Sequence, residues 1–339
     1  MNSVKGINKR YIAVDMVKLL FAVVIMLHHI FLQYNISNEI SQSIKYLIAL
    51  AVPYFFAVSG FFFFEKIYYG NNDIKKVTIS NIKKIMCMYS VWSLTIIVIK
   101  LPAMITNCQS IKSLLVLLVK EVRIFLLIGE YQLWYLVGLI YVLVMFYIFY
   151  RKRKLRYCIV VAVVCSIIRL VCTYNVNIFA TQNIISKLYN GYMIVFGTFR
   201  NGIFVGFTYF IIGCILSKYK CKITNKMYPL KILALLLIGG LSFIYQYNNA
   251  NILSEILEML VVVCILYCVL CVTRDKNAKL CRDLSSIIYV SHVTMILIVQ
   301  TLFKVNVISM IAIVAVVDIL FAIVIMEMSK RFKLLKNIY

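Results

Sequence analysis

The chain alternates between long apolar stretches and short polar segments. Ten apolar stretches are about 20 residues long, the length that an α-helix needs to cross the hydrocarbon core of a bilayer. This pattern predicts an all-α membrane protein with about ten transmembrane helices, forming one domain over residues 1–339 with its spans between 12 and 328. The predicted spans are 12–33, 45–65, 85–105, 131–150, 157–173, 201–217, 229–246, 255–273, 283–303 and 306–328.

One more apolar stretch, Ile111–Glu130, is interrupted by charged side chains. These are Lys112, Lys120, Glu121 and Arg123. We expect an interfacial or re-entrant helix there rather than an eleventh span. No small-x-small cleavage site follows the first apolar run, so we expect that run to be retained as a signal anchor.

Positive charge dominates the polar segments: Lys and Arg number 36 against 12 Asp and Glu, a formal net charge of +24. With the N-terminus inside, most of these cations fall at the two ends of the chain and in the alternate loops near 66–84, 151–156, 218–226 and 274–282. This bias predicts an even number of spans with both termini in the cytoplasm. No zinc-finger spacing or RNP-type aromatic motif accompanies the charge, which argues against a nucleic-acid partner.

Composition supports the membrane class, because 63% of the residues are apolar, 14% are charged and the mean hydropathy is +0.95. A soluble globular chain is closer to half apolar and a quarter charged. The 11 cysteines are scattered, and we interpret the Cys268–Cys271 pair as packing residues rather than a redox or metal site. With 3 histidines and no HxxxH or HExxH spacing, we expect no metal site and no bound cofactor.

The first span carries four ionisable side chains: Asp15, Lys18, His28 and His29. Such groups are costly inside a membrane and point to a functional site. Lys18 and His29 are eleven residues apart, which places them about 20° apart around the helix and about 16 Å apart along it. His28 lies about 80° from that face. Lysine can hold a phosphate and imidazole can take a proton from a hydroxyl, although Lys18 pairing with Asp15 is the structural alternative.

Other candidate positions each have a functional and a structural interpretation. Ser59, next to Gly60, suits close helix packing or contact with a ligand. Trp134 and Tyr135 begin a span, where aromatic residues either bind an acceptor or form the interfacial belt. Arg200, at the predicted outer mouth, suits an anionic acceptor.

Two ionisable residues lie within the last two predicted spans. His292 is interpreted either as a hydrogen-bonded structural histidine or as a functional one. Asp318 must be paired, protonated or in contact with a wet cavity, and the sequence does not reveal its partner.

Five segments, in this order along the chain, carry recognisable motifs. They are Asp15-Met-Val-Lys18 followed after ten residues by His29, then Val52–Phe61 (VPYFFAVSGF), Gln132–Leu136 (QLWYL), Arg200–Phe204 (RNGIF) and Ser285–His292 (SSIIYVSH). Together they resemble the acyltransferase-3 family of polytopic membrane acyltransferases. The sequence departs from that family at Lys18, where Arg is commoner, and at Gln132, where His is usual.

The resemblance implies transfer of an acyl group, commonly acetyl, from cytoplasmic acyl-CoA to a hydroxyl of a cell-surface glycan, lipid or polymer. It implies His29 as the general base and Lys18 as a group that holds the CoA phosphates. We expect the remaining motif positions to bind substrate: Asp15, Ser59, Trp134, Tyr135, Arg200 and His292. Direct transfer and an acyl-enzyme both stay open, because no Ser-His-Asp or Cys-His set is apparent.

Two other functions compete with acyl transfer. The first two spans and the WYL segment also resemble the membrane domain of vancomycin-resistance serine racemases, which implies an amino-acid or small-solute transporter. Transport would use the same intramembrane charges as a substrate path, yet no inverted repeat or broken helix pair is apparent. A purely structural membrane protein would leave Lys18 and His29 unexplained. For all three we expect a multi-pass protein of the cell membrane, and the family suits a bacterial inner membrane.

Overall fold

The computed structural model describes residues 11–34, 38–106, 108, 110–150, 154–175, 179, 184–220, 223, 228–248, 251–272 and 279–339. Every regular element in this part of the chain is helical. The helices that follow the predicted spans are α1 (Ile12–Tyr34), α2 (Asn38–Tyr68), α3 (Ile74–Thr106), α5 (Trp134–Phe149), α6 (Leu155–Tyr174), α8 (Phe207–Lys218), α9 (Tyr228–Asn248), α10 (Ile252–Cys271), α11 (Lys279–Leu302) and α12 (Val307–Arg331). The other elements are α4 (Ile111–Arg123), α7 (Ile184–Phe196), η1 (Ile124–Ile128), η2 (Tyr131–Leu133), η4 (Gly202–Gly206) and η6 (Lys333–Asn337).

Nine helices in the described part of the chain are long and apolar enough to cross a membrane. A shorter apolar helix over Gly202–Lys218 occupies the remaining predicted position. These findings confirm an all-α polytopic membrane protein with about ten spans. The cytoplasmic location of both termini stays a prediction, and several of the cations on which it rests lie outside the described residues. Those cations are Lys5, Lys9, Arg10, Arg151, Lys152, Arg153, Lys222, Lys226, Arg274 and Lys276.

Two helices extend beyond their predicted spans. α2 begins at Asn38 rather than at 45, and α3 begins at Ile74 rather than at 85. The added turns are polar, and those of α3 carry four lysines. Hydropathy detects only the part of a helix that suits the hydrocarbon core, whereas helical hydrogen bonding continues beyond it.

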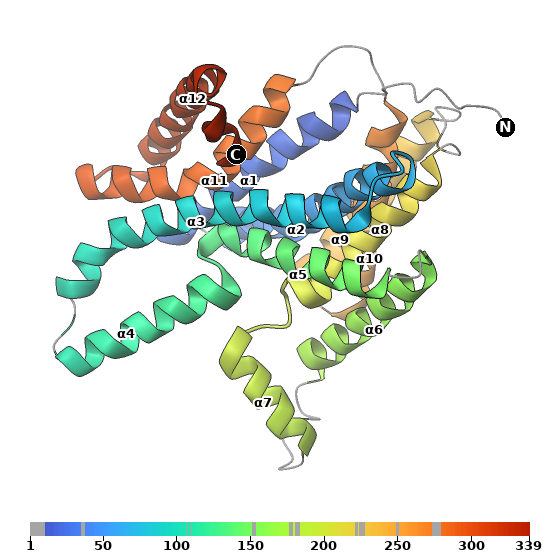
Figure 1. Ribbon diagram of the computed structural model, residues 1–339, viewed down its shortest axis with the longest axis horizontal. Helices are drawn as coiled ribbons and strands as arrows, with labels where there is room; N and C mark the ends of the chain where they lie inside the picture. The colour runs from blue at the N-terminus through green and yellow to red at the C-terminus, as the bar shows by residue number, and fades with distance from the viewer. Residues whose placement is uncertain are drawn as a thin grey trace.

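Two short helices, α4 and α7, project from the side of the bundle (Figure 1). α4 covers the segment expected to form an interfacial helix, and none of its side chains is buried. Its position in the membrane interface stays a prediction. The sequence pattern did not predict α7, because a helix of 13 residues is too short to satisfy the criterion for a span.

The core of the bundle is built around α2, whose side chains are largely buried. α2 packs closely against α8 through two glycines. A Cβ atom at Gly60 would lie 2.0 Å from the backbone oxygen of Phe210, and one at Gly213 would lie 1.8 Å from that of Ala57. Only glycine allows the two backbones to approach this closely. The expected packing role of the Ser59-Gly60 pair thus falls to the glycine.

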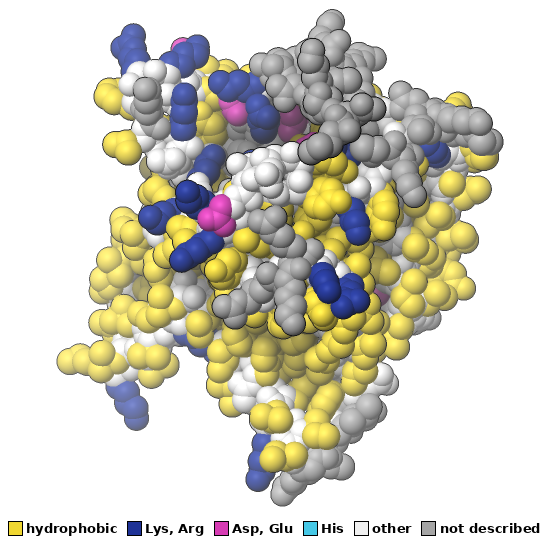
Figure 2. Space-filling view, turned by 45° about the vertical axis from the view of Figure 1, so that its right-hand side comes forward, with side chains coloured by type: hydrophobic (Ala, Val, Ile, Leu, Met, Phe, Trp, Pro, Cys, Tyr) yellow, Lys and Arg dark blue, Asp and Glu magenta, His cyan; other side chains and the backbone are white. Residues whose placement is uncertain are grey.

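The outer surface is strongly apolar. Figure 2 shows hydrophobic side chains over most of the visible face, and most of its lysine and arginine side chains lie in the upper half. α9 has the smallest buried fraction of the candidate spans, with 6% of its most apolar window buried. A soluble protein does not expose so much continuous apolar surface, and lipid is the environment that suits it.

Candidate active site

Two histidines face each other where α1 packs against α11. The ring centroids of His29 and His292 are 5.3 Å apart. His292 is fully buried, and its Nδ1 lies 2.8 Å from the backbone oxygen of Ile288. A carbonyl oxygen only accepts, so Nδ1 donates and the neutral ring presents Nε2 as an acceptor. Nε2 is buried and has no hydrogen-bond partner among the described residues. The pair therefore offers an imidazole nitrogen that can bind a proton or a substrate hydroxyl.

Two other rings complete the surroundings of His29. The ring centroid of His28 lies 5.6 Å away and that of Tyr131 lies 6.4 Å away. His29 keeps a partly exposed side chain, whereas His292 has none of its surface exposed. A substrate can therefore reach His29 more readily than its partner.

Lys18 lines a cavity of about 400 Å³. Two more lysines, Lys66 of α2 and Lys84 of α3, line the same space. Ser59 and Tyr135 also belong to its wall, so the structure brings together three of the predicted site residues. Three ammonium groups around one cavity suit a ligand that carries phosphate. We call this space the lysine cavity.

Lys18 and His29 both face α11, as their helical spacing predicts. Lys18 shares the lysine cavity with Ser285 and Tyr289 of α11, and His29 meets His292 further along the same helix. Within the described residues Lys18 forms no ion pair within 4 Å, and Asp15 influences it from a longer distance. Asp15 lines neither the lysine cavity nor the other cavities described here, and its role in substrate binding stays a prediction.

Buried aromatic side chains separate the lysine cavity from the histidine pair. Tyr289 lines the cavity, and its ring centroid is 6.4 Å from that of His292 and 5.7 Å from that of Tyr135. The hydroxyls of Tyr135 and Ser59 share a hydrogen bond of 2.8 Å. Ser59 and Tyr135 therefore hold each other in place in the wall of the cavity.

Gln132 occupies the first position of the QLWYL motif, where the acyltransferase-3 family usually has histidine. Its side-chain amide donates to the backbone oxygen of Val290 at 3.3 Å, and its own backbone oxygen accepts from the Tyr289 hydroxyl. The side-chain oxygen of Gln132 is buried without a partner among the described residues. Gln132 thus ties η2 to α11 beside His292, and this task requires a donor but no charge.

Trp134 and Arg200 line a second cavity of about 220 Å³. Most of its large side chains are aromatic: Tyr131, Trp134, Tyr141 and Phe196. Tyr131 is both a wall of this aromatic cavity and a neighbour of His29, so the cavity adjoins the histidine pair. Tyr131 has a φ of 40°, a left-handed conformation that costs a residue with a Cβ about 1–2 kcal/mol. This strained position is what presents the ring toward both places.

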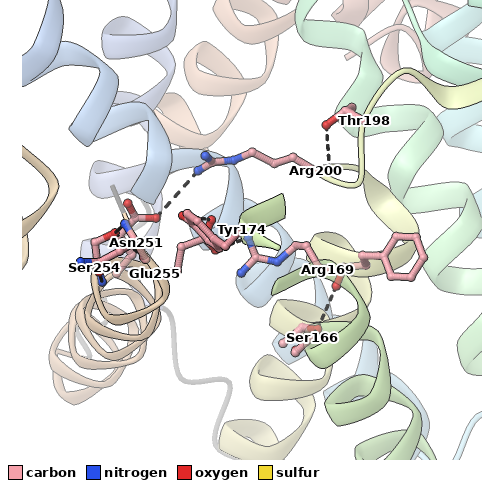
Figure 3. A network of polar contacts seen from close by, with 11 residues as sticks. Ser166, Arg169, Tyr174, Thr198, Arg200, Asn251, Ser254 and Glu255 are labelled. Carbon is pink, nitrogen blue, oxygen red and sulfur yellow. Dashed lines mark hydrogen bonds and ion pairs between the residues drawn. The ribbon is translucent and has the colours of Figure 1, made fainter. Parts of the chain in front are cut away.

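Arg200 also belongs to a network of charged side chains (Figure 3). One of its guanidinium nitrogens lies 3.8 Å from Glu258, which is buried in α10. Arg169 of α6 pairs with Glu255, and the Tyr174 hydroxyl donates to the same carboxylate at 3.0 Å. The Arg200 side chain remains half exposed, with 51% of its surface accessible. Glu258 therefore holds Arg200 loosely at the aromatic cavity, and the rest of the network links α6 to α10.

A second ionic cluster lies beside the aromatic cavity. Lys100 contacts Glu121 at 3.2 Å and Glu130 at 3.3 Å, and its ammonium lies 5.5 Å from the Tyr131 ring centroid. Burial, together with a hydrogen bond to Glu121, raises the pKa of Glu130 to about 7. Partial burial alone would raise the pKa of Glu121, but hydrogen bonds to Glu130 and Lys100 lower it. The cluster holds the strained turn that presents Tyr131.

Asp318 has the partner that the sequence could not reveal. The Ser291 hydroxyl contacts its carboxylate at 2.7 Å, one residue before His292 in α11. The other carboxylate oxygen has no partner among the described residues. This buried pair joins α12 to the segment of α11 that carries the histidine.

Several residues of the site were not predicted from the sequence. Lys66 and Lys84 were counted only as loop cations, and Tyr289 was read only as part of a motif. Glu130 was only the last residue of the expected interfacial segment, although an acidic residue beside an apolar span was an available signal. No three His, Cys, Asp or Glu side chains of the described chain lie close enough together to hold a metal ion.

Comparison with known proteins identifies the architecture. The sequence profile of the acyltransferase-3 family, described as an acyltransferase domain, matches residues 11–327. No curated protein and no solved structure gives a match. The profile spans nearly all of the ten-helix frame, from α1 with His29 to α12 with Asp318, and so contains the whole site. The chain belongs to the acyltransferase-3 family and is a membrane acyltransferase.

Proposed function

We propose that this protein is an O-acyltransferase that moves an acetyl group from acetyl-CoA to a hydroxyl of a cell-surface glycan, lipid or polymer. The observation that carries the proposal is the placement of two different cavities on either side of the His29–His292 pair. One is suited to phosphate and the other to an aromatic-stacked acceptor. The family membership supports the acyl-transfer step itself.

The lysine cavity is the proposed donor site. Lys18, Lys66 and Lys84 bind the phosphates of CoA there, with the cavity opening to the cytoplasm. The acyl-bearing arm then passes the Ser59–Tyr135 pair toward the histidines. The cavity volume of about 400 Å³ is at the small end of the range for small-molecule sites. Because acetyl-CoA is a large molecule, part of the donor stays outside the cavity.

His29 is the proposed general base. The acceptor hydroxyl attacks the thioester carbonyl carbon while its proton passes to the imidazole of His29. The C–S bond breaks, and the proton returns from the imidazolium to the leaving thiolate, so the enzyme ends unchanged. The unpartnered Nε2 of His292 binds the acceptor or a water beside His29. In the aromatic cavity, Trp134 stacks on the acceptor and Arg200 binds an anionic group on it.

The test uses membranes containing the full chain, radiolabelled acetyl-CoA, and extracted lipids and glycans as acceptors. His29→Ala is expected to lower label transfer by about 10²–10⁴-fold, the usual contribution of a general base. His28→Ala is the matched control, since it removes the neighbouring imidazole from the same helix, and it is expected to retain most activity. Unchanged transfer by a correctly inserted His29→Ala protein would contradict the assigned base.

Transport of an amino acid or small solute is the competing function. Two cavities that adjoin one histidine pair would also suit a substrate that crosses the membrane. Solute flux into vesicles without any acyl-CoA would favour transport. Label transfer that depends on His29 would favour the enzyme. A bacterial inner membrane is the proposed location for either function.

A further inference from the structure

A third cavity, of about 450 Å³, lies at the edge of the bundle between the beginning of α6 and the end of α8. It is outside the active site, and no motif of the family covers it. Its polar wall consists of three cations and one tyrosine: Lys154, Arg156, Lys218 and Tyr219. Its other wall is apolar, formed by Leu155, Ile159 and Ile215. We call it the rim cavity.

The three cations of the rim cavity lack acidic partners. Among the described residues, none of Lys154, Arg156 and Lys218 has a carboxylate within 4 Å. The nearby carboxylate of Glu65 is already paired, with Lys220 at 2.5 Å. All three side chains are exposed, so their charges are accessible to an anion that enters the space between them. The cavity therefore has the charge of an anion-binding site.

Two tyrosines, Tyr157 and Tyr219, lie next to cations of the cavity, a pairing that is typical of side chains at a membrane interface. The guanidinium of Arg156 lies 5.0 Å from the ring centroid of Tyr157, and the ammonium of Lys218 lies 5.5 Å from that of Tyr219. Tyrosine and long cationic side chains sit at this level with their apolar parts toward the hydrocarbon and their polar ends in water. The cavity thus lies at the depth where phospholipid headgroups are found.

An exposed apolar stripe runs along α6 from this cavity. Val160, Val163, Val164 and Ile167 follow Arg156 at intervals of four, seven, eight and eleven residues, which places them on the same helix face. All four are exposed, Val160 to 61% and Ile167 to 55%. A phosphate held by Arg156 would therefore have its attached hydrocarbon chains directed along this stripe. A free phosphate would make no use of it.

From the unpaired cations and the continuous apolar stripe, we infer that the rim cavity binds the phosphate headgroup of an anionic phospholipid, whose acyl chains lie along α6. The phosphate is held by Lys154 and Arg156 of one helix and Lys218 of another. The bound lipid thereby joins the beginning of α6 to the end of α8. This lipid is distinct from the donor and acceptor of the proposed reaction.

The test titrates the purified full chain in detergent with phosphatidylglycerol or phosphatidylcholine of identical acyl chains, and counts bound lipid by native mass spectrometry. The wild type is expected to bind phosphatidylglycerol at least tenfold more tightly than phosphatidylcholine. The triple variant Lys154→Gln, Arg156→Gln, Lys218→Gln is expected to lose this preference. A matched triple variant on α3, Lys75→Gln, Lys76→Gln, Lys83→Gln, removes the same charge from exposed positions and is expected to retain it.

Three results would overturn the inference. The first is that the rim triple variant keeps the preference for phosphatidylglycerol. The second is that the α3 triple variant loses the preference to the same extent, which would show that only the overall charge matters. The third is that glycerol 3-phosphate binds as tightly as phosphatidylglycerol, which would make the ligand a soluble phosphate. If the triple variant fails to fold, Arg156→Gln alone decides, with an expected loss of about fivefold, the effect of one cation near a membrane surface. Variants with arginine at Lys154 and Lys218 should keep the preference.

Discussion

The two cavities beside the histidine pair are built from opposite kinds of side chain. The lysine cavity gathers three cations from α1, α2 and α3 and several hydroxyls from α2, α5 and α11. The aromatic cavity has four aromatic rings and a single cation, Arg200, which Glu258 holds at 3.8 Å. A site that needs several unpaired cations suits a ligand with several phosphates, whereas rings with one loosely held cation suit a ring-shaped ligand with at most one anionic group. Under the proposed function, this difference assigns acetyl-CoA to the lysine cavity and the acceptor to the aromatic cavity.

The sharpest way to break this assignment is to remove the charge of Lys18. Lys18→Gln is expected to raise KM for acetyl-CoA by about tenfold to a hundredfold, because a hydrogen bond to a charged group contributes about 1.5–3 kcal/mol. KM for the acceptor should stay unchanged. Lys18→Arg keeps the charge and should retain most of the affinity, and Lys75→Gln controls for lost surface charge. Steady-state kinetics with each substrate varied in turn gives both constants. A change confined to the acceptor constant would reverse the two cavities.

The close packing of α2 against α8 lies in the core of the bundle, so disturbing it is expected to lower the stability of the whole protein rather than to affect one cavity alone. Gly60→Ala places a Cβ 2.0 Å from the backbone oxygen of Phe210, which forces the helices apart. We expect the protein to lose about 1–3 kcal/mol of stability, the usual effect of overpacking. Gly240→Ala on α9 is the matched control, since no atom lies within 4 Å of its Cβ. Thermal unfolding in detergent measures the stability of both variants. Equal unfolding midpoints for Gly60→Ala and Gly240→Ala would contradict the packing argument.

Removing the charge of Arg200 is expected to have a smaller effect, which is confined to binding of the acceptor. Arg200→Gln should raise KM for an anionic acceptor by up to about fivefold, because the ion pair of a half-exposed cation contributes at most about 1 kcal/mol. KM for acetyl-CoA should be unaffected, which is the mirror image of the result for Lys18. Neutral acceptors should be used equally well by the variant and the wild type. An increase in the constant for acetyl-CoA would place Arg200 on the donor side.

The sequence could predict features that belong to a single helix, but not features that depend on how several helices pack together. The spans followed from the length of apolar stretches, and the shared face of Lys18 and His29 followed from helical periodicity, because both properties belong to a single helix. The opposition of His29 and His292 depends on how α1 packs against α11, and periodicity carries no information about that. The motifs supplied the order of the segments without their distances.

The residues that prediction missed share a physical cause. Lys66 and Lys84 lie on polar turns that hydropathy assigned to a loop, yet α2 and α3 continue through them and direct them into the lysine cavity. The partner of Asp318 is a serine, a residue whose sequence neighbours give no sign of a buried contact. Polar groups that act through packing between helices become visible only once the helices are placed.

The smallest expected effect concerns pH and the aromatic side alone. The pKa of Glu130 is about 7, raised mainly by burial above its usual value of about 4.3 in an unfolded chain. The folded protein therefore binds more protons at this position between those two values, so this carboxyl stabilises the fold below about pH 4 and the contribution is lost as pH rises toward 7. Glu130→Gln removes the titration, so its unfolding midpoint in detergent should fall less than that of the wild type between pH 5 and 7.5.

Because Glu130 adjoins Tyr131 and not the lysine cavity, any pH-dependent change in affinity that it causes should affect the acceptor and leave acetyl-CoA binding unchanged. Parallel pH profiles of the unfolding midpoint for the variant and the wild type would contradict the raised pKa of Glu130.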